Sequence, residues 1–323
     1  MSETSKASVS FVTVDEEDAG QRLDNFLLKR LKGVPKSHVY RIVRSGEVRV
    51  NKGRADVTTR VCAGDVIRLP PVRVAEQPKA PNNATAAADT MQLPIVYEDD
   101  ALLVIDKPAG IAVHGGSGIS FGVIELLRAQ RPQAKFLELV HRLDRETSGL
   151  LLVAKKRSAL VKMHEVLRES HGIDKRYLAL VEGVWPHTRC HVKMKLLKYE
   201  TPDGERRVKV HADGLSSHTV VNRQQAWPSA SLLECELKTG RTHQIRVHLS
   251  ASGHAILGDD KYGDSAVNRA LPKQGLRRMF LHAWRLTLNH PLTGEKMTLE
   301  APLPADLQAY IHQLNSNQSN TQG

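Results

Sequence analysis

The sequence predicts an α+β protein in which a small basic domain is followed by a larger domain that contains both helices and strands. In the small domain, 20–73, apolar residues recur first at helical and then at strand spacing. Residues 74–94 are poor in large apolar side chains and rich in Ala, Pro and Asn, which is typical of a linker. In the larger domain, 95–312, short apolar runs of strand type alternate with amphipathic helical runs.

Two short helices are predicted in the small domain by apolar residues at helical spacing, Leu23, Phe26, Leu27 and Leu31 in the first and Val39, Ile42 and Val43 in the second. Gly46 is expected to end the second helix. After it EVRVN alternates as a strand, NKGR forms a turn, and GDVIRLP reads as a closing strand. The small domain is therefore a helix-helix-strand module.

The larger domain is predicted from its apolar runs. Strands are expected over ALLVID, LELVHRL, LLLVAKK, YLALVEG and SLLECEL. Helices are expected over SFGVIELLRAQ and SALVKMHEVLRES. The last residues, 313–323, are polar and are expected to be a disordered tail.

The charge balance points to a polyanionic partner. The 323 residues include 46 Lys and Arg against 35 Asp and Glu, a formal net charge of +11. Nucleic acid is the leading candidate for such an excess. An anionic membrane surface is the rival, but no apolar stretch approaches the roughly 20 residues that span a bilayer. The polar start MSETSKASVS does not resemble a secretory signal, so a cytoplasmic protein is expected.

Cysteine and histidine usage favours neither a disulfide framework nor a metal centre. Cys62, Cys190 and Cys235 lie far apart in the sequence. The fifteen histidines form no HExxH motif and no Cys/His quartet at ligand spacing. We therefore expect no metal.

Basic residues are concentrated in the small domain. Between Arg22 and Arg60 eleven basic residues stand against three acidic ones. Such a run is usually a solvated face, but this module is too small to hold a catalytic pocket of its own. An RNA-contacting role is favoured, and the residues assigned to it are Lys36, Arg41, Arg44, Arg49 and Lys52.

The run LELVHRLDRETSGLLLVAKK places a polar loop between two apolar strands. If the first strand stays extended, Arg142 and Asp144 share one face, and His141 and Leu143 share the other. A single Asp near a strand end is usually a structural ion pair or an Asx turn. Here polar residues cluster from Arg142 to Thr147, which would be costly if they served packing alone. Asp144 is therefore a candidate for chemistry.

The segment HRLDRETSGLLLVAKK resembles the signature of the ribosomal and transfer RNA pseudouridine synthases, whose catalytic aspartate lies in H-R-L-D-x-x-T-S-G. Other segments similar to that family follow in the expected order, DKPAGIAVHGG, KRYLALVEG and GRTHQIRVHLSASGH. The basic run VPKSHVYRIVRSGEVRVNKGR resembles an S4-type RNA-binding domain. The resemblance implies an S4-like domain followed by a mixed, largely antiparallel-sheet catalytic domain.

The resemblance also implies an activity, the isomerisation of uridine to pseudouridine in large-subunit ribosomal RNA. Breaking the C1′–N1 bond, turning the base and rejoining it through C5 involves no redox change and no net group transfer, so no cofactor is expected. Asp144 would attack the sugar or assist its deprotonation, and the sequence leaves both routes open. Nothing in the sequence demands a dimer, so a monomer is expected.

Further site residues are assigned on the same resemblance. Arg246 would pair with Asp144 and keep it ionised, while Arg241 would bind phosphate. Tyr177 would stack on the base, although an ordinary core tyrosine is the alternative. Arg142 would fill the gap left by a flipped base. For Lys107 in DKPAG, direct RNA contact and support of a loop are both open.

Two local expectations concern the loops near these residues. A helix is expected after GRTHQ, with Thr242 as its N-cap, Ile245 and Leu249 on its apolar face and Gly253 at its end. The HGGSG run from His114 matches neither a P-loop nor a G-x-S-x-G elbow, so a flexible loop is expected there.

Three alternatives stay open from the sequence. The catalytic segments look alike for ribosomal and transfer RNA, and only the S4-like module favours ribosomal RNA. An RNA-binding assembly factor could retain the fold without the activity. An aspartate-dependent nucleoside hydrolase would instead release free uracil.

Overall fold

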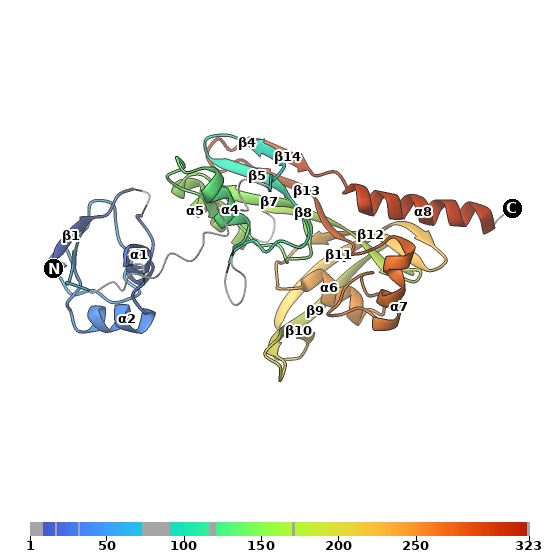
Figure 1. Cartoon of the computed structure of the whole chain (residues 1–323), viewed down its shortest axis with the longest axis horizontal. Coiled ribbons are helices and arrows are strands. Elements are labelled where there is room, and N and C mark those ends of the chain that lie inside the picture. The colour runs from blue at the N-terminus through green and yellow to red at the C-terminus, as the bar shows by residue number, and fades with distance from the viewer. Residues whose placement is uncertain are drawn as a thin grey trace, which may run out of the picture. The chain divides into compact units, whose positions relative to one another are not determined.

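The structure is a computed structural model that describes residues 9–16, 18–31, 33–72, 91–115, 121–169 and 172–321. The chain divides into two compact units, Met1–Asn83 and Ala84–Gly323 (Figure 1). The division falls within the residues 74–94 that were expected to be a linker, most of which lie outside the described residues.

The first unit places two helices on a small antiparallel sheet (Figure 1). Its elements are β1 (Ser10–Thr13), α1 (Leu23–Arg30), α2 (Lys36–Arg44), β2 (Arg49–Val50) and β3 (Val66–Leu69). The sheet order is β1-β3-β2, and the core includes Leu23 and Phe26 of α1, Val39 and Ile42 of α2, and Ile67 of β3. The predicted helix-helix-strand module is therefore present.

The bounds predicted for the small domain need one correction. Its sheet begins with β1, which lies before the predicted start at residue 20. Three of the four residues of β1 are exposed, so the strand lacks the buried face that sequence periodicity detects. The NKGR turn is confirmed, because Asn51 and Lys52 both adopt positive φ, at 49° and 67°, as a type I′ hairpin turn requires.

The second unit is built on one large sheet, eleven-stranded among the described residues. Its main path runs β10-β9-β11-β12-β8-β13-β7-β5-β4, while β14 pairs with β13 and β6 with β7. All of these pairs are antiparallel except β13 with β7, which confirms the mixed, largely antiparallel prediction. The strands are β4 (Ile95–Glu98), β5 (Leu102–Lys107), β6 (Glu138–Leu139), β7 (Ser148–Ala154), β8 (Ile173–Glu182), β9 (Arg189–Glu200), β10 (Arg206–Val210), β11 (Leu215–Trp227), β12 (Ala230–Leu237), β13 (Leu281–Asn289) and β14 (Lys296–Glu300).

Helices cover this sheet in separate groups. They are α4 (Val123–Gln130), α5 (Arg157–Arg168), α6 (Gln244–Ala251), α7 (Ser265–Ala270), the short 3₁₀ helix η1 (Leu271–Gln274) and α8 (Ala305–Thr321). One apolar cluster joins α4 and α6 to the middle strands, and it includes Tyr177. A second cluster packs α5, and a third packs η1 and α8. The candidate site lies beside the first cluster.

The only parallel pairing among the described strands depends on a glycine. Gly149 of β7 has a φ of +108°, and a Cβ there would lie 2.2 Å from the carbonyl oxygen of Ala283 in β13. No larger residue fits without moving one of the two strands. This close contact holds the start of β7, and with it the end of the loop that carries Asp144.

The tail expected to be disordered from residue 313 is helical instead, because α8 continues to Thr321. Leu314 packs against the apolar cluster under α8. The side-chain oxygen of Asn315 accepts hydrogen bonds from Gln225 at 2.7 Å and from the indole of Trp227 at 3.0 Å. These long-range contacts stabilise a segment whose polar composition alone does not predict a helix. No described helix is long and apolar enough to cross a bilayer.

Candidate active site

Asp144 lies in a loop that begins where β6 separates from β7. The strand predicted over LELVHRL is shorter than expected, because β6 ends at Leu139, so the condition for Arg142 and Asp144 to share a strand face is not met. Just beyond, the imidazole Nε2 of His141 accepts the backbone N–H of Leu152 at 3.2 Å, in place of a main-chain partner. Burial, together with the charge of Lys175, lowers the pKa of His141 to about 4, consistent with a neutral acceptor. The next residues leave the sheet, and the Asp144 side chain stays 26% exposed.

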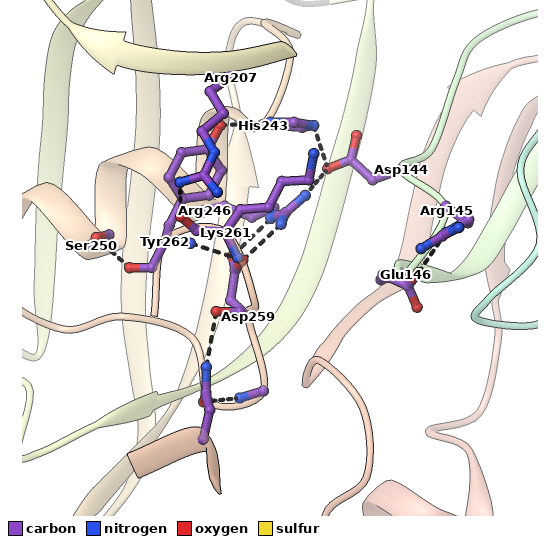
Figure 2. Close-up of polar contacts among 12 residues, drawn as sticks. Asp144, Arg145, Glu146, Arg207, His243, Arg246, Ser250, Asp259, Lys261 and Tyr262 are labelled. Carbon is purple, nitrogen blue, oxygen red and sulfur yellow. Dashed lines mark hydrogen bonds and ion pairs between the residues drawn. The ribbon is translucent and has the colours of Figure 1, made fainter. Parts of the chain in front are cut away.

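Arg246 joins Asp144 to a second carboxylate (Figure 2). Its Nη1 donates to Asp144 Oδ2 at 3.1 Å, while Nε and Nη2 donate to the two oxygens of Asp259, each at 2.7 Å. The Arg246 side chain is 5% exposed and that of Asp259 1% exposed. Burial opposes the positive charge, but the hydrogen bonds and charges of the two carboxylates outweigh it and raise the pKa of Arg246. The predicted proximity of Asp144 and Arg246 is therefore present.

The start of α6 differs from the prediction. Its N-cap is His243, not Thr242, and His243 has the left-handed conformation with φ 53°. The turn before the helix is held by Gln244, whose Oε1 accepts from the Arg241 N–H at 3.0 Å and from the Thr239 hydroxyl at 2.7 Å. The side chain of Gln244, the first residue of the helix, therefore makes the hydrogen bonds that were expected from the hydroxyl of Thr242. Gly253, with φ +83°, follows the helix as predicted.

α6 is fixed to the sheet through His248, a core residue and not a solvated one. The Gln244 amide donates to Thr219 Oγ1, which lies 3.0 Å from His248 Nδ1. On its other side, His248 Nε2 lies 2.7 Å from Ser217 Oγ, which itself donates to Met194 O. These directions suit a neutral ring that accepts at Nδ1 and donates at Nε2. Burial lowers the pKa of His248 to about 4.

Tyr177 lies on β8 and faces the same cleft as Asp144. It is 7% exposed, and burial together with the charge of Asp144 raises its pKa. No described residue hydrogen-bonds to its hydroxyl. The cleft has a volume of about 960 Å³, and its lining includes Arg142, Asp144, Tyr177, Arg241, His243 and Arg246. Such a volume is in the usual range for a site that encloses a small ligand, here enough for one nucleotide.

The two arginines assigned to RNA lie at the rim of this cleft. Arg142 is exposed, and no carboxylate among the described residues pairs with it. Arg241 is also exposed, and its Nε donates to the carbonyl of Ser216 at 3.2 Å, which orients the guanidinium. Both side chains are therefore available to a ligand, in contrast to Arg246.

Lys107 is not available for RNA contact, so its assignment to the substrate is wrong. The residue is fully buried. Its Nζ donates to three backbone carbonyls, those of Pro108 at 2.8 Å, Ile111 at 2.9 Å and Arg145 at 3.1 Å. Burial lowers the pKa of Lys107 to about 7, while the charges of Glu146 and Asp144 oppose the shift. Lys107 ties the loop after β5 to the loop that carries Asp144, which is the supporting role left open above.

The cations assigned in the first unit gather around α2. Lys36, Arg41 and Arg44 are exposed and line a shallow groove on the helix with Tyr40. Arg49, on β2, lies at the C-terminal end of the helix, within 3.5 Å of where a Cβ on Gly46 would lie. Lys52 is exposed at the hairpin turn, outside this groove.

Two residues that contact the candidate site were not singled out from the sequence, Asp259 and Tyr262. The Tyr262 hydroxyl lies 2.7 Å from His243 Nδ1, and its ring lies 5.1 Å from the Arg246 guanidinium. The backbone N–H groups of Lys261 and Tyr262 donate to Asp259 Oδ1, so the loop holds its own carboxylate in place. The available signal was the polar run GDDKYGD directly after the apolar residues AIL. The expected flexible loop over HGGSG lies mostly outside the described residues.

No group of three or more His, Cys, Asp or Glu residues in the described part of the chain is placed to hold a metal ion. The cleft instead brings together an aspartate held by an arginine and a buried, neutral tyrosine. A site of this kind can supply a fixed, ionised carboxylate to a polar ring compound held against an aromatic face.

Comparison with known proteins identifies the class. Residues 101–251, which contain Asp144, Tyr177 and Arg246, match the RNA pseudouridylate synthase family, and residues 21–67 match the S4 domain. The chain belongs to the RNA pseudouridine synthase family and is an enzyme of that class with an S4 domain at its N-terminal side.

Individual proteins of this family are similar to the chain over most of its length. The chain is 52% identical over 315 residues to ribosomal large subunit pseudouridine synthase C of Haemophilus ducreyi, covering 97% of this chain and 98% of that one. It is 52% identical over 320 residues to the protein of the same name from Escherichia coli, covering 97% and 99%. The solved structure of human RNA pseudouridylate synthase domain containing 4 is 28% identical, with a TM-score of 0.60 over 72% of this chain and 97% of that chain.

Proposed function

We propose that this chain converts uridine to pseudouridine in large-subunit ribosomal RNA, with Asp144 as the nucleophile. The observation that carries the proposal is the half-buried carboxylate of Asp144, held by Arg246 at 3.1 Å in a cleft that it shares with Tyr177. The names of the relatives from Haemophilus ducreyi and Escherichia coli support the choice of RNA.

The reaction requires a carboxylate, a uracil ring held in a fixed position and a cleft that excludes water. Asp144 attacks C1′ or removes a proton from the sugar, and the C1′–N1 bond breaks with its electron pair left on the uracil. The ring turns and C5 bonds to C1′. In the first route this bond displaces Asp144, and in the second Asp144 returns its proton to the sugar. C5 then loses its proton and N1 takes one up, so the product is an isomer of the substrate. Arg246 holds the carboxylate in place at the start of either route.

Other cleft residues would hold the nucleotide. Tyr177 is placed to stack on the detached base, because its ring lines the cleft and its hydroxyl is not used elsewhere by the described residues. Arg241 and Arg142 are the exposed cations at the rim, suited to phosphate and to the space left by an extruded base. Their permanent charge suits both tasks.

The first unit would anchor the RNA through its electrostatic field. Lys36, Arg41 and Arg44 offer cations to phosphates along the shallow groove on α2, and Arg49 and Lys52 add two more nearby. We place the enzyme in the cytoplasm, where bacterial ribosomal RNA is made.

The test is to incubate the chain with unmodified large-subunit ribosomal RNA and to map pseudouridine by carbodiimide adduct and primer extension. Wild type should give discrete stops, and Asp144→Asn should give none while binding the RNA as tightly. Asp213→Asn, which changes an exposed carboxylate in a turn, is the matched control and should behave as wild type. Turnover by Asp144→Asn would refute the role of Asp144.

The same assay separates the alternatives. Pseudouridine formed in bulk transfer RNA but not in ribosomal RNA would show that the substrate is transfer RNA. Free uracil in a chromatogram would indicate a hydrolase. RNA binding without product on either RNA would indicate a binding factor that has kept only the fold.

A further inference from the structure

We propose that His243 is a positioning residue for Asp144, held by Tyr262 as the neutral tautomer whose Nε2–H faces the carboxylate. The inference rests on the proposed function in taking Asp144 as the reacting group. It adds a histidine and a tyrosine to the residues that set the geometry of the site (Figure 2).

The backbone of His243 is the first observation. Its φ of 53° and ψ of 21° lie in the left-handed region, which residues other than glycine adopt rarely because it strains the chain. Such conformations persist where the surroundings enforce them, and they concentrate at functional sites. Here the conformation directs the imidazole into the cleft, where the side chain is 14% exposed and Nε2 lies 3.8 Å from Asp144 Oδ2.

The hydrogen bonds around Tyr262 determine which nitrogen of His243 carries the hydrogen. The backbone N–H of Val208 donates to the Tyr262 oxygen at 2.9 Å. That oxygen also lies 2.7 Å from His243 Nδ1, and the described residues offer it no other acceptor. The tyrosine hydrogen therefore goes to Nδ1, which must accept it. The remaining hydrogen of the neutral ring is then on Nε2, the nitrogen that faces Asp144.

The other protonation states of His243 fit the site less well. With the hydrogen on Nδ1, the Tyr262 hydroxyl hydrogen would have no acceptor among the described residues, and a lone pair on Nε2 would face the carboxylate of Asp144. An imidazolium would add a second full charge next to Asp144, which would make the carboxylate less reactive. The neutral ring with Nε2–H avoids both problems.

Charged groups from three elements face the ring of His243. Asp144 approaches from the loop after β6, Arg246 from α6, and Asp259 and Lys261 from the loop after α6. Burial lowers the pKa of His243 most, and the two cations act in the same direction. The two carboxylates oppose them without reversing the shift. The ring is therefore neutral at pH 7.

The positioning role of His243 follows from its approach to the same oxygen of Asp144 that Arg246 contacts. Arg246 Nη1 at 3.1 Å and His243 Nε2 at 3.8 Å both approach Asp144 Oδ2. No described residue donates a hydrogen bond to Oδ1 or forms an ion pair with it. A separation of 3.8 Å is longer than a hydrogen bond, and catalytic hydrogen bonds are often long until substrate binds. His243 and Arg246 together limit rotation of the carboxylate, so Oδ1 is the oxygen presented to the sugar.

The test combines nitrogen NMR with single-turnover kinetics on the full chain. Long-range ¹H–¹⁵N spectra of histidine-labelled protein distinguish the two tautomers, and the signal missing from His243→Gly assigns His243. We expect Nε2–H in wild type and loss of this fixed tautomer in Tyr262→Phe. An Nδ1–H tautomer in wild type would overturn the inference.

His243→Gly is suited to the kinetic test because glycine accepts the left-handed backbone without strain. The variant should fold and bind RNA as wild type does, while single-turnover conversion falls on the order of 100-fold, the loss expected from a misplaced reacting group. Tyr262→Phe should move the acid limb of the rate to higher pH, because the neutral ring loses a hydrogen bond.

An unchanged rate in His243→Gly would overturn the positioning role. Failure of the proposed function would be seen separately, as absence of pseudouridine with the wild-type chain, since the tautomer is read without RNA.

Discussion

The two units of this chain use positive charge in opposite ways. On α2 of the first unit Lys36, Arg41 and Arg44 are exposed, and no described carboxylate pairs with them. In the cleft of the second unit Arg246 is 5% exposed at its side chain and contacts two carboxylates. The first arrangement leaves charge free for a ligand, whereas the second uses it inside the protein.

The exposed cations of the first unit should therefore affect how tightly RNA binds, whereas the buried arginine of the second unit should affect the geometry of the cleft. Exposed cations attract phosphates over roughly the 8 Å Debye length of physiological salt, and their effect fades as salt rises. A buried guanidinium between Asp144 and Asp259 is screened much less. Its two bonds to Asp259 and its single bond to Asp144 fix where both carboxylates lie. Mutations on α2 should therefore weaken RNA binding, whereas mutations at Arg246 should reduce stability and catalysis.

The largest effect is expected from Arg246→Gln, which leaves two carboxylates near each other without their cation. Removing one partner of a buried ion pair costs about 3 to 5 kcal/mol of unfolding free energy, and conversion should be lost with it. Urea unfolding and single-turnover assays measure the two losses. Arg285→Gln is the control, because the Arg285–Glu300 pair is 35% and 52% exposed and should contribute no more than about 1 kcal/mol. Equal losses of unfolding free energy and of conversion in the two variants would contradict the proposed difference between buried and exposed arginines.

The next effect concerns His248, the buried neutral ring that fixes α6 and so positions Arg246. Its pKa is about 4 in the folded chain, below its ordinary value of 6.5, so the unfolded chain binds more protons between these values. The stability that His248 contributes is complete above pH 6.5 and is lost as the pH falls toward 4.

His248→Gln should therefore be less stable than wild type by roughly 2 to 3 kcal/mol at pH 7.5, and by much less at pH 4.5. Urea unfolding at several pH values measures this difference. His312→Gln, an exposed position on α8, should show no such trend. A His248→Gln deficit that is constant with pH would contradict the neutral, buried assignment.

The comparison also explains what could be predicted from the sequence. The cations of α2 follow from composition and helical spacing, since exposure is what a polar helix face predicts by itself. Asp144 stood out as a polar loop between apolar strands, and its pairing with Arg246 came from family resemblance. The two residues are 102 positions apart, and the sequence between them carries no local sign of the contact.

What escaped prediction depended on tertiary contacts. Asp259 and Tyr262 lie in a polar run that reads as an ordinary loop until Arg246 and His243 are placed beside it. Lys107 ends an apolar strand, and only the fold shows that three carbonyls converge on its Nζ. Similarly, Asn315 is a helix residue because Trp227 and Gln225 reach it. Local propensity carries none of this information.

The smallest effect is expected from the exposed cations, and it should appear only in RNA binding. Each phosphate contact contributes about 0.7 to 0.9 to the slope of log affinity against log salt, so Arg41→Gln combined with Arg44→Gln should lower the slope by about 1.5. Conversion at saturating RNA should stay unchanged, because neither residue lines the cleft. Filter binding at several salt concentrations measures the slope.

The matched control for this pair is Arg269→Gln combined with Lys273→Gln, which removes the same charge from exposed positions of the second unit. If net charge alone steered the RNA, both double variants would lose the same slope. A loss confined to the α2 variant would instead place phosphates on that helix. The first unit would then act by local contact, and Arg41 and Arg44 would be available to phosphates because no described carboxylate pairs with them.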